Sequence, residues 1–180
     1  MKKLHVILDL DETLVSSQRM DELDAADMAS MKAKLKWHDI DGYYIAFERP
    51  HLQEFLDELF KTYKVSVWSA GSKDYVLEII EKVVLVKKQR VLEYIFFSYH
   101  CKLSKQRYSG QPKNLCLLWD TFKIHKFRSS NTLIIDDHHD VQSCQPSNCI
   151  QIKEFDVLDP NSFKDNELVR IIHDLQTHTF

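Results

Sequence analysis

Short apolar runs alternate along this chain with longer segments in which every third or fourth residue is apolar. The short runs lie near residues 4 to 9, 64 to 69, 94 to 99, 131 to 136 and 148 to 152. Their length and their β-branched residues predict buried strands. The amphipathic segments predict helices near residues 51 to 63, 73 to 86, 112 to 123 and 166 to 177. This alternation predicts an α/β fold.

Residues 37 to 47 follow a different pattern. The runs Trp37 to Ile40 and Tyr43 to Phe47 are joined by Asp41-Gly42, a dipeptide typical of tight hairpin turns. We therefore expect a β-hairpin there. The preceding stretch from Met20 to Leu35 is rich in Ala, Met and acidic residues, and it forms either a helix over the hairpin or a mobile flap. The chain shows no internal repeat or linker, so we expect one domain over residues 1–180.

Composition narrows the class of protein. Of the 180 residues, 44% are hydrophobic and 28% are charged, which is ordinary for a soluble globular protein. The net charge is only −3 and there is no strong basic stripe, so nonspecific nucleic-acid binding is not favoured. A basic cluster between Lys102 and Arg107 can attract an anionic substrate, with Arg107 as a candidate contact.

Cysteine usage and hydropathy bear on the compartment. The four cysteines lack the paired spacing of a zinc site, so we expect reduced thiols; they are Cys101, Cys116, Cys144 and Cys149. Asp9 interrupts the apolar run near the N-terminus, and no apolar stretch reaches the roughly 20 residues of a membrane span. We therefore expect an intracellular protein, in the cytoplasm or the nucleus, with no membrane partner.

The first apolar run ends in two acidic residues one position apart, Asp9 and Asp11, with Thr13 two residues further on. Ligands of open α/β sheets bind beyond the carboxyl ends of the strands, where these side chains would stand. There Asp9 can attack phosphorus as a nucleophile, and Asp11 can act as general acid and base. Thr13 and the amides of the turn can bind the phosphoryl oxygens. The alternative is a strand end followed by an Asx-type turn.

Further candidates end the later strands. Ser69 precedes a helical pattern and can bind phosphate at the helix N-terminus, although a plain N-cap serine explains it equally well. Lys113 can reach a phosphoryl group or the nucleophile, although most lysines simply lie at a surface. Asp136 and Asp137 would repel the first acidic pair unless a cation lay between them, and Mg²⁺ suits such oxygen ligands.

The order of these motifs resembles the haloacid dehalogenase (HAD) superfamily, and within it the phosphatases that act on the C-terminal domain of RNA polymerase II. The similarity runs from Asp9-Leu10-Asp11-Glu12-Thr13 through Glu48-Arg49-Pro50, the strand ending at Ser69, Pro112-Lys113 and Ile135-Asp136-Asp137 to Asp165-Asn166-Glu167-Leu168. It implies a HAD-like Rossmannoid fold: a central, mainly parallel five-stranded sheet flanked by helices. A small β-hairpin or flap insertion, without a large cap, completes the expected architecture.

The resemblance also implies a magnesium site. Its ligands would be the Asp9 carboxylate, the Asp11 backbone carbonyl and one acid of the Asp136-Asp137 pair. We favour Asp137 as the ligand and Asp136 as its supporting partner, although the two roles can be exchanged. The histidines that follow, His138 and His139, suggest zinc, but hard oxygen ligands at a phosphoryl site favour magnesium.

The function implied is Mg²⁺-dependent hydrolysis of protein phosphoserine or phosphothreonine through an aspartyl-phosphate, with the RNA polymerase II C-terminal domain as a candidate substrate. A site without a large cap is open to a phosphopeptide, and Trp37, Tyr43 and Tyr44 offer an aromatic surface for a proline-containing segment. Two alternatives remain at this point. One is a phosphatase for nucleic-acid ends or small phosphoesters, and the other is a noncatalytic binding protein on a HAD fold.

Overall fold

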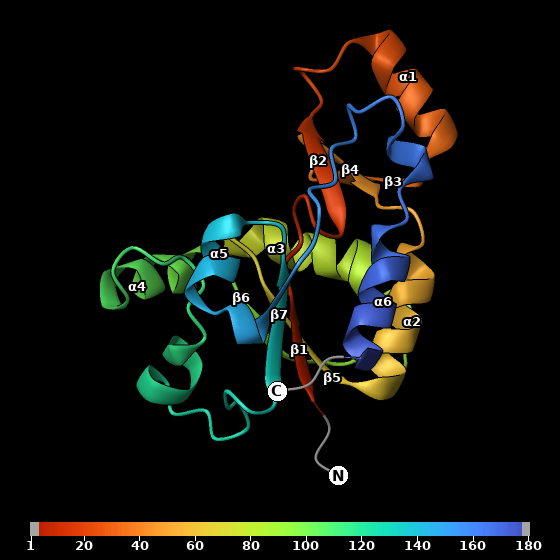
Figure 1. Cartoon of the computed structure of the whole chain (residues 1–180). Helices are drawn as coiled ribbons and strands as arrows, with labels where there is room; N and C mark the ends of the chain where they lie inside the picture. Colours follow the sequence, from red (N-terminus) through yellow and green to blue (C-terminus); the bar gives the residue numbers. More distant parts are fainter. Residues whose placement is uncertain (1–3, 178–180) are drawn as a thin grey trace.

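The computed structural model describes residues 4–177, and its centre is a five-stranded parallel sheet (Figure 1). The strands are β1 (His5–Leu8), β5 (Lys64–Trp68), β6 (Leu92–Phe96), β7 (Thr132–Asp136) and β8 (Cys149–Gln151). Their order is β6-β5-β1-β7-β8. Leu8 at the end of β1 is paired with Val67 on one side and Ile135 on the other. The carboxyl ends of these three strands therefore lie side by side.

Helices cover both faces of this sheet. The helices α2 (Leu52–Thr62), α3 (Lys73–Ile79) and α6 (Glu167–Thr177) pack on one face, where they share an apolar core with Val6 and Leu8 of β1. On the other face, α4 (Ser98–Arg107) and α5 (His139–Cys144) contribute to a second core around Ile7. Figure 1 shows α2 and α6 on one side of the strands, and α4 and α5 on the other. Alternate residues of β1 serve opposite faces, which explains why the strand is apolar throughout.

A small insertion stands beyond the carboxyl end of β1, at the top of Figure 1. The antiparallel strands β2 (Val15–Arg19), β4 (Tyr44–Glu48) and β3 (Trp37–Ile40) form its sheet, in that order. The predicted hairpin is present, and Asp41 and Gly42 turn its corner with φ of 54° and 65°. Of the two alternatives for the preceding stretch, the structure has the helix, α1 (Ala25–Lys34), which the Asp24 side chain caps.

Several parts of the chain differ from the prediction. The strand expected near 94 to 99 ends at Phe96, and the helix α4 follows at once. The sequence pattern did not predict α4, because only Cys101 and Ser104 of this helix are buried and its sequence carries no apolar stripe. The strand β2 was not predicted either, because its polar sequence has no alternation of apolar and polar residues.

The prediction of a helix near 112 to 123 was wrong for the first half of that range. Pro112, Lys113 and Leu115 lie in turns, and the short π-helical turn η2 (Leu117–Thr121) follows. The Asn114 side chain caps Cys116, and the Gln145 side chain accepts from the Leu115 amide. These side-chain bonds replace the backbone bonds of a regular first turn. The helix expected over 73 to 86 likewise ends as a π-helical turn, η1 (Ile80–Val84).

Two 3₁₀ turns, η3 (Pro146–Asn148) and η4 (Ser162–Lys164), complete the described elements. None of the helices within residues 4–177 combines the length and apolar character that crossing a bilayer requires.

The packing of α2 on the sheet yields a prediction for stability. Phe55 is fully buried in the core that α2 shares with β1 and β5. Phe55→Ala should lower the free energy of unfolding by about 3–5 kcal/mol, because it removes apolar contacts and leaves a cavity. Urea unfolding measures the change. Leu77→Ala is the control, since Leu77 is 40% exposed on α3; an equal loss in both variants would contradict this description of the core.

Candidate active site

Polar side chains converge at the carboxyl ends of β5, β1 and β7. Asp9 follows β1, Ser69 follows β5, and Asp136 ends β7. A pocket of about 330 Å³ opens there, and its lining includes Asp9, Asp11, Glu12, Lys105, Lys113 and Asp137. The parallel register of the three strands places these groups at one edge although they are far apart in the sequence.

Lys113 is the cation at the centre of this group. Its Nζ lies 2.8 Å from Asp9 Oδ1 and 2.7 Å from Asp136 Oδ2, and all three side chains are buried. Burial by itself would lower the pKa of Lys113, but the two carboxylates outweigh it and the pKa is raised. Burial also raises the pKa of Asp9 and that of Asp136, and the Lys113 ammonium opposes both rises. The lysine is therefore a buried counter-ion and not a surface residue.

Asp9 is oriented by two donors on the same oxygen. The Leu10 amide donates to Asp9 Oδ1 at 2.8 Å, and Lys113 Nζ lies at 2.8 Å from that atom. Among residues 4–177, no hydrogen bond reaches Asp9 Oδ2. This second oxygen is therefore the one available for a reaction partner.

Asp11 is held from a different direction. The Tyr75 hydroxyl donates to Asp11 Oδ1, and the Ser69 hydroxyl donates to Asp11 Oδ2 at 3.5 Å. Ser69 Oγ also accepts from the Gly71 amide at 2.9 Å. Burial raises the pKa of Asp11, and the bond from Tyr75 opposes that rise. A carboxyl group with a raised pKa can carry the proton that a general acid delivers.

Thr13 links the first acidic segment to the last. It is fully buried, and its Oγ1 donates to Asp137 Oδ1 at 3.1 Å. Its hydroxyl is therefore bonded to a candidate metal ligand, which adds to the phosphate-binding role expected of it.

The acidic residues of β1 and β7 form a candidate metal centre. One carboxylate oxygen from each of Asp9, Asp136 and Asp137 lies within 4.8 Å of the others, a group that contains neither His138 nor His139. Asp136 accepts from Lys113 on Oδ2 and from the His138 amide on Oδ1, so both of its oxygens have donors. Asp137 is less buried and accepts only from Thr13 Oγ1 among the described side chains. An all-oxygen set of this kind fits Mg²⁺.

Other candidates lie further from the centre. Arg107 is exposed at the end of α4 and does not line the pocket, whereas Lys105 of the same helix does. Trp37 and Tyr43 are exposed on the insertion, at 41% and 47%. Tyr44 packs edge-on against Tyr75, with ring centroids 5.7 Å apart.

Sequence reasoning missed two residues of the site, Tyr75 and Glu12. The sequence pattern shows Tyr75 only as one residue of the amphipathic segment near 73 to 86, but in the structure it stands in the first turn of α3, which begins just past Ser69. That position was the available signal, since a first-turn side chain can face a strand-end site. Glu12 adopts φ of 57°, and burial together with Asp11 and Asp137 raises its pKa to about 7.

The buried ion group predicts a pH-dependent loss of stability on removal of its cation. Lys113→Met leaves Asp9 and Asp136 buried without a counter-ion, at a cost of about 3–5 kcal/mol at pH 8. Without the ammonium, the pKa values of Asp9 and Asp136 in the folded protein rise further above their values in the unfolded chain. The loss in the free energy of unfolding should therefore grow as the pH rises from 5 to 8. Urea unfolding with a chelator present measures it.

The control is Lys126→Met, because the Lys126 side chain is 59% exposed where it pairs with Glu93. Its effect should be smaller and equal at both pH values, since the pKa of Glu93 is about 2, lowered by hydrogen bonds from Lys64 and Lys126. A Lys113→Met loss that does not change with pH would show that the carboxylates are not its partners in solution.

Comparisons with known proteins agree with this arrangement. The chain is 38% identical over 182 residues to the CTD phosphatase-like protein 355R of Invertebrate iridescent virus 3, covering 98% of this chain and 97% of that protein. A protein of the same name from Invertebrate iridescent virus 6 is 36% identical over 180 residues, covering 97% of this chain and 98% of the relative.

Solved structures show the same fold. The RNA polymerase II CTD phosphatase Fcp1 of fission yeast superposes with a TM-score of 0.64 at 16% identity, over 98% of this chain but only 51% of that one. A HAD-like hydrolase of Porphyromonas gingivalis gives a TM-score of 0.54 at 13% identity, over 98% and 99% of the two chains. The fold is therefore HAD-like, as expected from the motifs.

The family model for NLI interacting factor-like phosphatases matches residues 4–179. With this match and the two viral relatives, the chain belongs to the NLI interacting factor-like phosphatase family.

Proposed function

We propose that this protein is a Mg²⁺-dependent phosphatase that hydrolyses protein phosphoserine or phosphothreonine through an aspartyl-phosphate on Asp9. The main support is the way in which the Asp9 side chain is held in the structure. Its Oδ1 is fixed by Lys113 and the Leu10 amide, and the residue lines a pocket that Asp11 also lines. Family membership supports the phosphatase activity; the nucleophile, the metal and the protein substrate are the proposal.

In the first step, an Asp9 oxygen forms a bond to phosphorus as the bond from phosphorus to the seryl oxygen breaks. Asp11 gives its proton to that leaving oxygen, which departs as the serine hydroxyl. In the second step, Asp11 takes a proton from water, the water oxygen bonds to phosphorus, and the bond to Asp9 breaks. Inorganic phosphate leaves and both carboxyl groups return to their starting states.

Asp9, the Asp11 backbone carbonyl and Asp137 would hold Mg²⁺, with Asp136 as the supporting partner through its bond with Lys113. Bound there, the cation supplies positive charge opposite the phosphoryl oxygens and the nucleophile. Lys113, Ser69 and Thr13 would bind the same oxygens. Ser69 Oγ already accepts from the Gly71 amide, so its position is fixed before phosphate arrives.

The substrate class follows from the insertion and from the relatives. The insertion is a three-stranded sheet with one helix, small enough to leave the pocket open to a peptide. Relatives named CTD phosphatase-like make the C-terminal domain of RNA polymerase II a candidate substrate. The exposed Trp37 and Tyr43 and the half-buried Tyr44 offer the aromatic surface on which a proline-containing segment can dock.

Substitution of the nucleophile tests the proposal directly. Asp9→Asn should lower kcat on an aryl phosphate and on a phosphoserine polymerase-tail peptide by at least about 10³-fold, since an amide cannot form the phosphoenzyme. Native activity should require Mg²⁺ and be lost with chelator. Asp140→Asn is the control, because Asp140 lines the same pocket but is not part of the acidic group.

Equal activity of the native protein and Asp9→Asn would refute the nucleophile. A preference for oligonucleotides with a terminal phosphate over the phosphopeptide would refute the protein substrate and leave the chemistry intact. Turnover at background level with Mg²⁺ present would favour the noncatalytic binding protein.

The bond from Tyr75 to Asp11 gives a second prediction. Tyr75→Phe removes the hydroxyl that orients the general acid and leaves the ring packed on Tyr44. We expect kcat to fall about tenfold with KM nearly unchanged, since a poorly oriented general acid slows proton transfer more than it weakens substrate binding. Steady-state kinetics measure this, and an unchanged kcat would show that Asp11 does not need the bond.

A further inference from the structure

Arg49 is a fully buried cation that the proposed chemistry does not use. It lies between β4 and α2, in the Glu48-Arg49-Pro50 segment, and its side chain has no exposed surface. A buried charge is costly unless each of its donors has a partner. The partners of Arg49 therefore indicate what the residue does.

One set of partners is the turn that follows Asp11. Arg49 Nη1 donates to the carbonyl oxygen of Thr13 at 3.0 Å and to that of Glu12 at 3.5 Å. The Arg49 backbone amide also donates to the Leu14 carbonyl at 3.0 Å. Side chain and backbone of one residue thus hold three consecutive carbonyls of the turn.

This turn requires external support. Glu12 adopts a left-handed φ of 57°, which is unfavourable for a residue with a side chain. An unfavourable conformation persists only where the surrounding structure fixes it.

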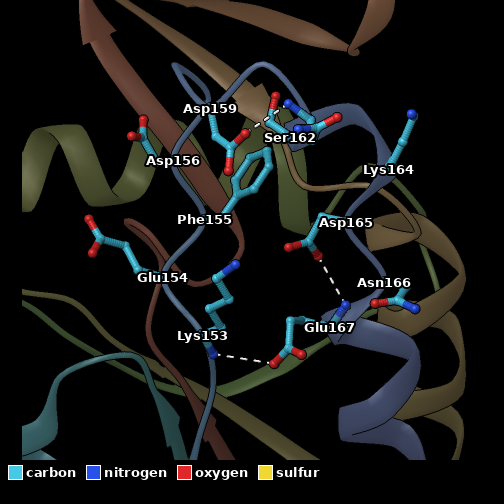
Figure 2. Close-up of a pocket in the computed structure, with 11 residues that line it drawn as sticks. Lys153, Glu154, Phe155, Asp156, Asp159, Ser162, Lys164, Asp165, Asn166 and Glu167 are labelled. Carbon is cyan, nitrogen blue, oxygen red and sulfur yellow. Dashed lines mark hydrogen bonds between the residues drawn. The ribbon is translucent and has the colours of Figure 1, made fainter.

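The second set of partners lies in the C-terminal segment, residues 153–167. Arg49 Nε and Nη2 donate to Asp165 Oδ1 and Oδ2, both at 2.8 Å, and Nη2 donates to the Lys153 carbonyl at 2.8 Å. The guanidinium also lies over the Phe155 ring, 5.3 Å from its centroid. Asp165 in turn accepts from the Glu167 amide at the start of α6, the bond drawn in Figure 2.

The same segment contacts the turn directly. The Phe155 amide donates to the Glu12 carbonyl at 2.7 Å, the oxygen that Arg49 also approaches. Figure 2 shows Phe155 and Asp165 on two neighbouring segments of the chain. Both residues line a cavity of about 550 Å³. The C-terminal segment is therefore bonded to the turn once by its own backbone and again through Arg49.

We propose that Arg49 is a positioning residue: by joining the Glu12–Leu14 turn to the C-terminal segment, it holds Asp11 and Thr13 in their reactive positions. Thr13 bonds Asp137 and Asp11 bonds Tyr75, so a shift of the turn would disturb both contacts. The C-terminal segment then belongs to the catalytic unit. The kinetic part of this inference rests on the proposed phosphatase function.

Arg90 provides a matched control. Its side chain is also without exposed surface, and it also pairs with an aspartate, Asp57, at 2.8 Å. It also donates to backbone carbonyls, those of Val84 at 2.9 Å and Gln53 at 3.0 Å. None of these partners lines the candidate active site.

The experiment compares Arg49→Lys with Arg90→Lys, at a temperature where thermal unfolding shows both to be folded. A lysine keeps the charge but cannot reproduce the several fixed bonds of a guanidinium. Kinetics on an aryl phosphate with Mg²⁺ and hydrogen–deuterium exchange without substrate are measured on the same samples. Asp165→Asn is the second variant, should Arg49→Lys not fold.

We expect Arg49→Lys to lower kcat by about 10- to 100-fold with KM within about threefold, since a displaced catalytic group affects the reaction more than binding. Exchange should increase at residues 12–15 and 153–157. Arg90→Lys should retain kcat within about twofold and show no change at those residues.

Equal losses of kcat in the two variants, or native kcat and native exchange in Arg49→Lys, would overturn the positioning role. If the native protein itself shows no turnover, the proposed function fails. The exchange measurement then decides alone whether Arg49 holds the turn.

Discussion

The buried pairing of Lys113 with Asp9 and Asp136 is the constraint on which the rest of the site depends. Two carboxylates, those of Asp9 and Asp136, face one ammonium in a place where water is largely excluded, and the less buried Asp137 lies beside them. A lysine there stabilises the folded protein only with both partners present, because an unpaired buried charge costs several kcal/mol. The remaining excess of negative charge is a reason for the site to take up a divalent cation.

The sheet brings these charges together. Adjacent parallel strands end at the same edge, so β1 and β7 place Asp9 beside Asp136, and β5 places Ser69 near Asp11. Helices on both faces keep water from the strands and leave the strand ends as the place where polar side chains gather. The insertion rises beyond that edge and contributes no carboxylate to the acidic group.

Much of this could be predicted from the sequence, because strands buried on both faces are apolar throughout and the acids at their ends stand out. The helix α4 could not, since its few buried residues form no stripe. Nor could the turns around Lys113, which depend on the side chain of Gln145, 32 residues away. Tyr75 lies 64 residues from Asp11, and no local pattern reports a contact at such a separation.

Arg49 and Arg90 show why burial alone does not assign a role. Both guanidiniums are hidden, both pair with an aspartate and both bind backbone carbonyls. The two arginines differ in the segments of the chain whose carbonyls they bind. Arg90 joins α2 to the chain after α3. Arg49 joins the turn after Asp11 to a segment that begins at Lys153, 104 residues beyond Arg49 itself. Since Glu12 would not hold its left-handed conformation unaided, the distant segment contributes to the geometry at Asp11 without touching a substrate.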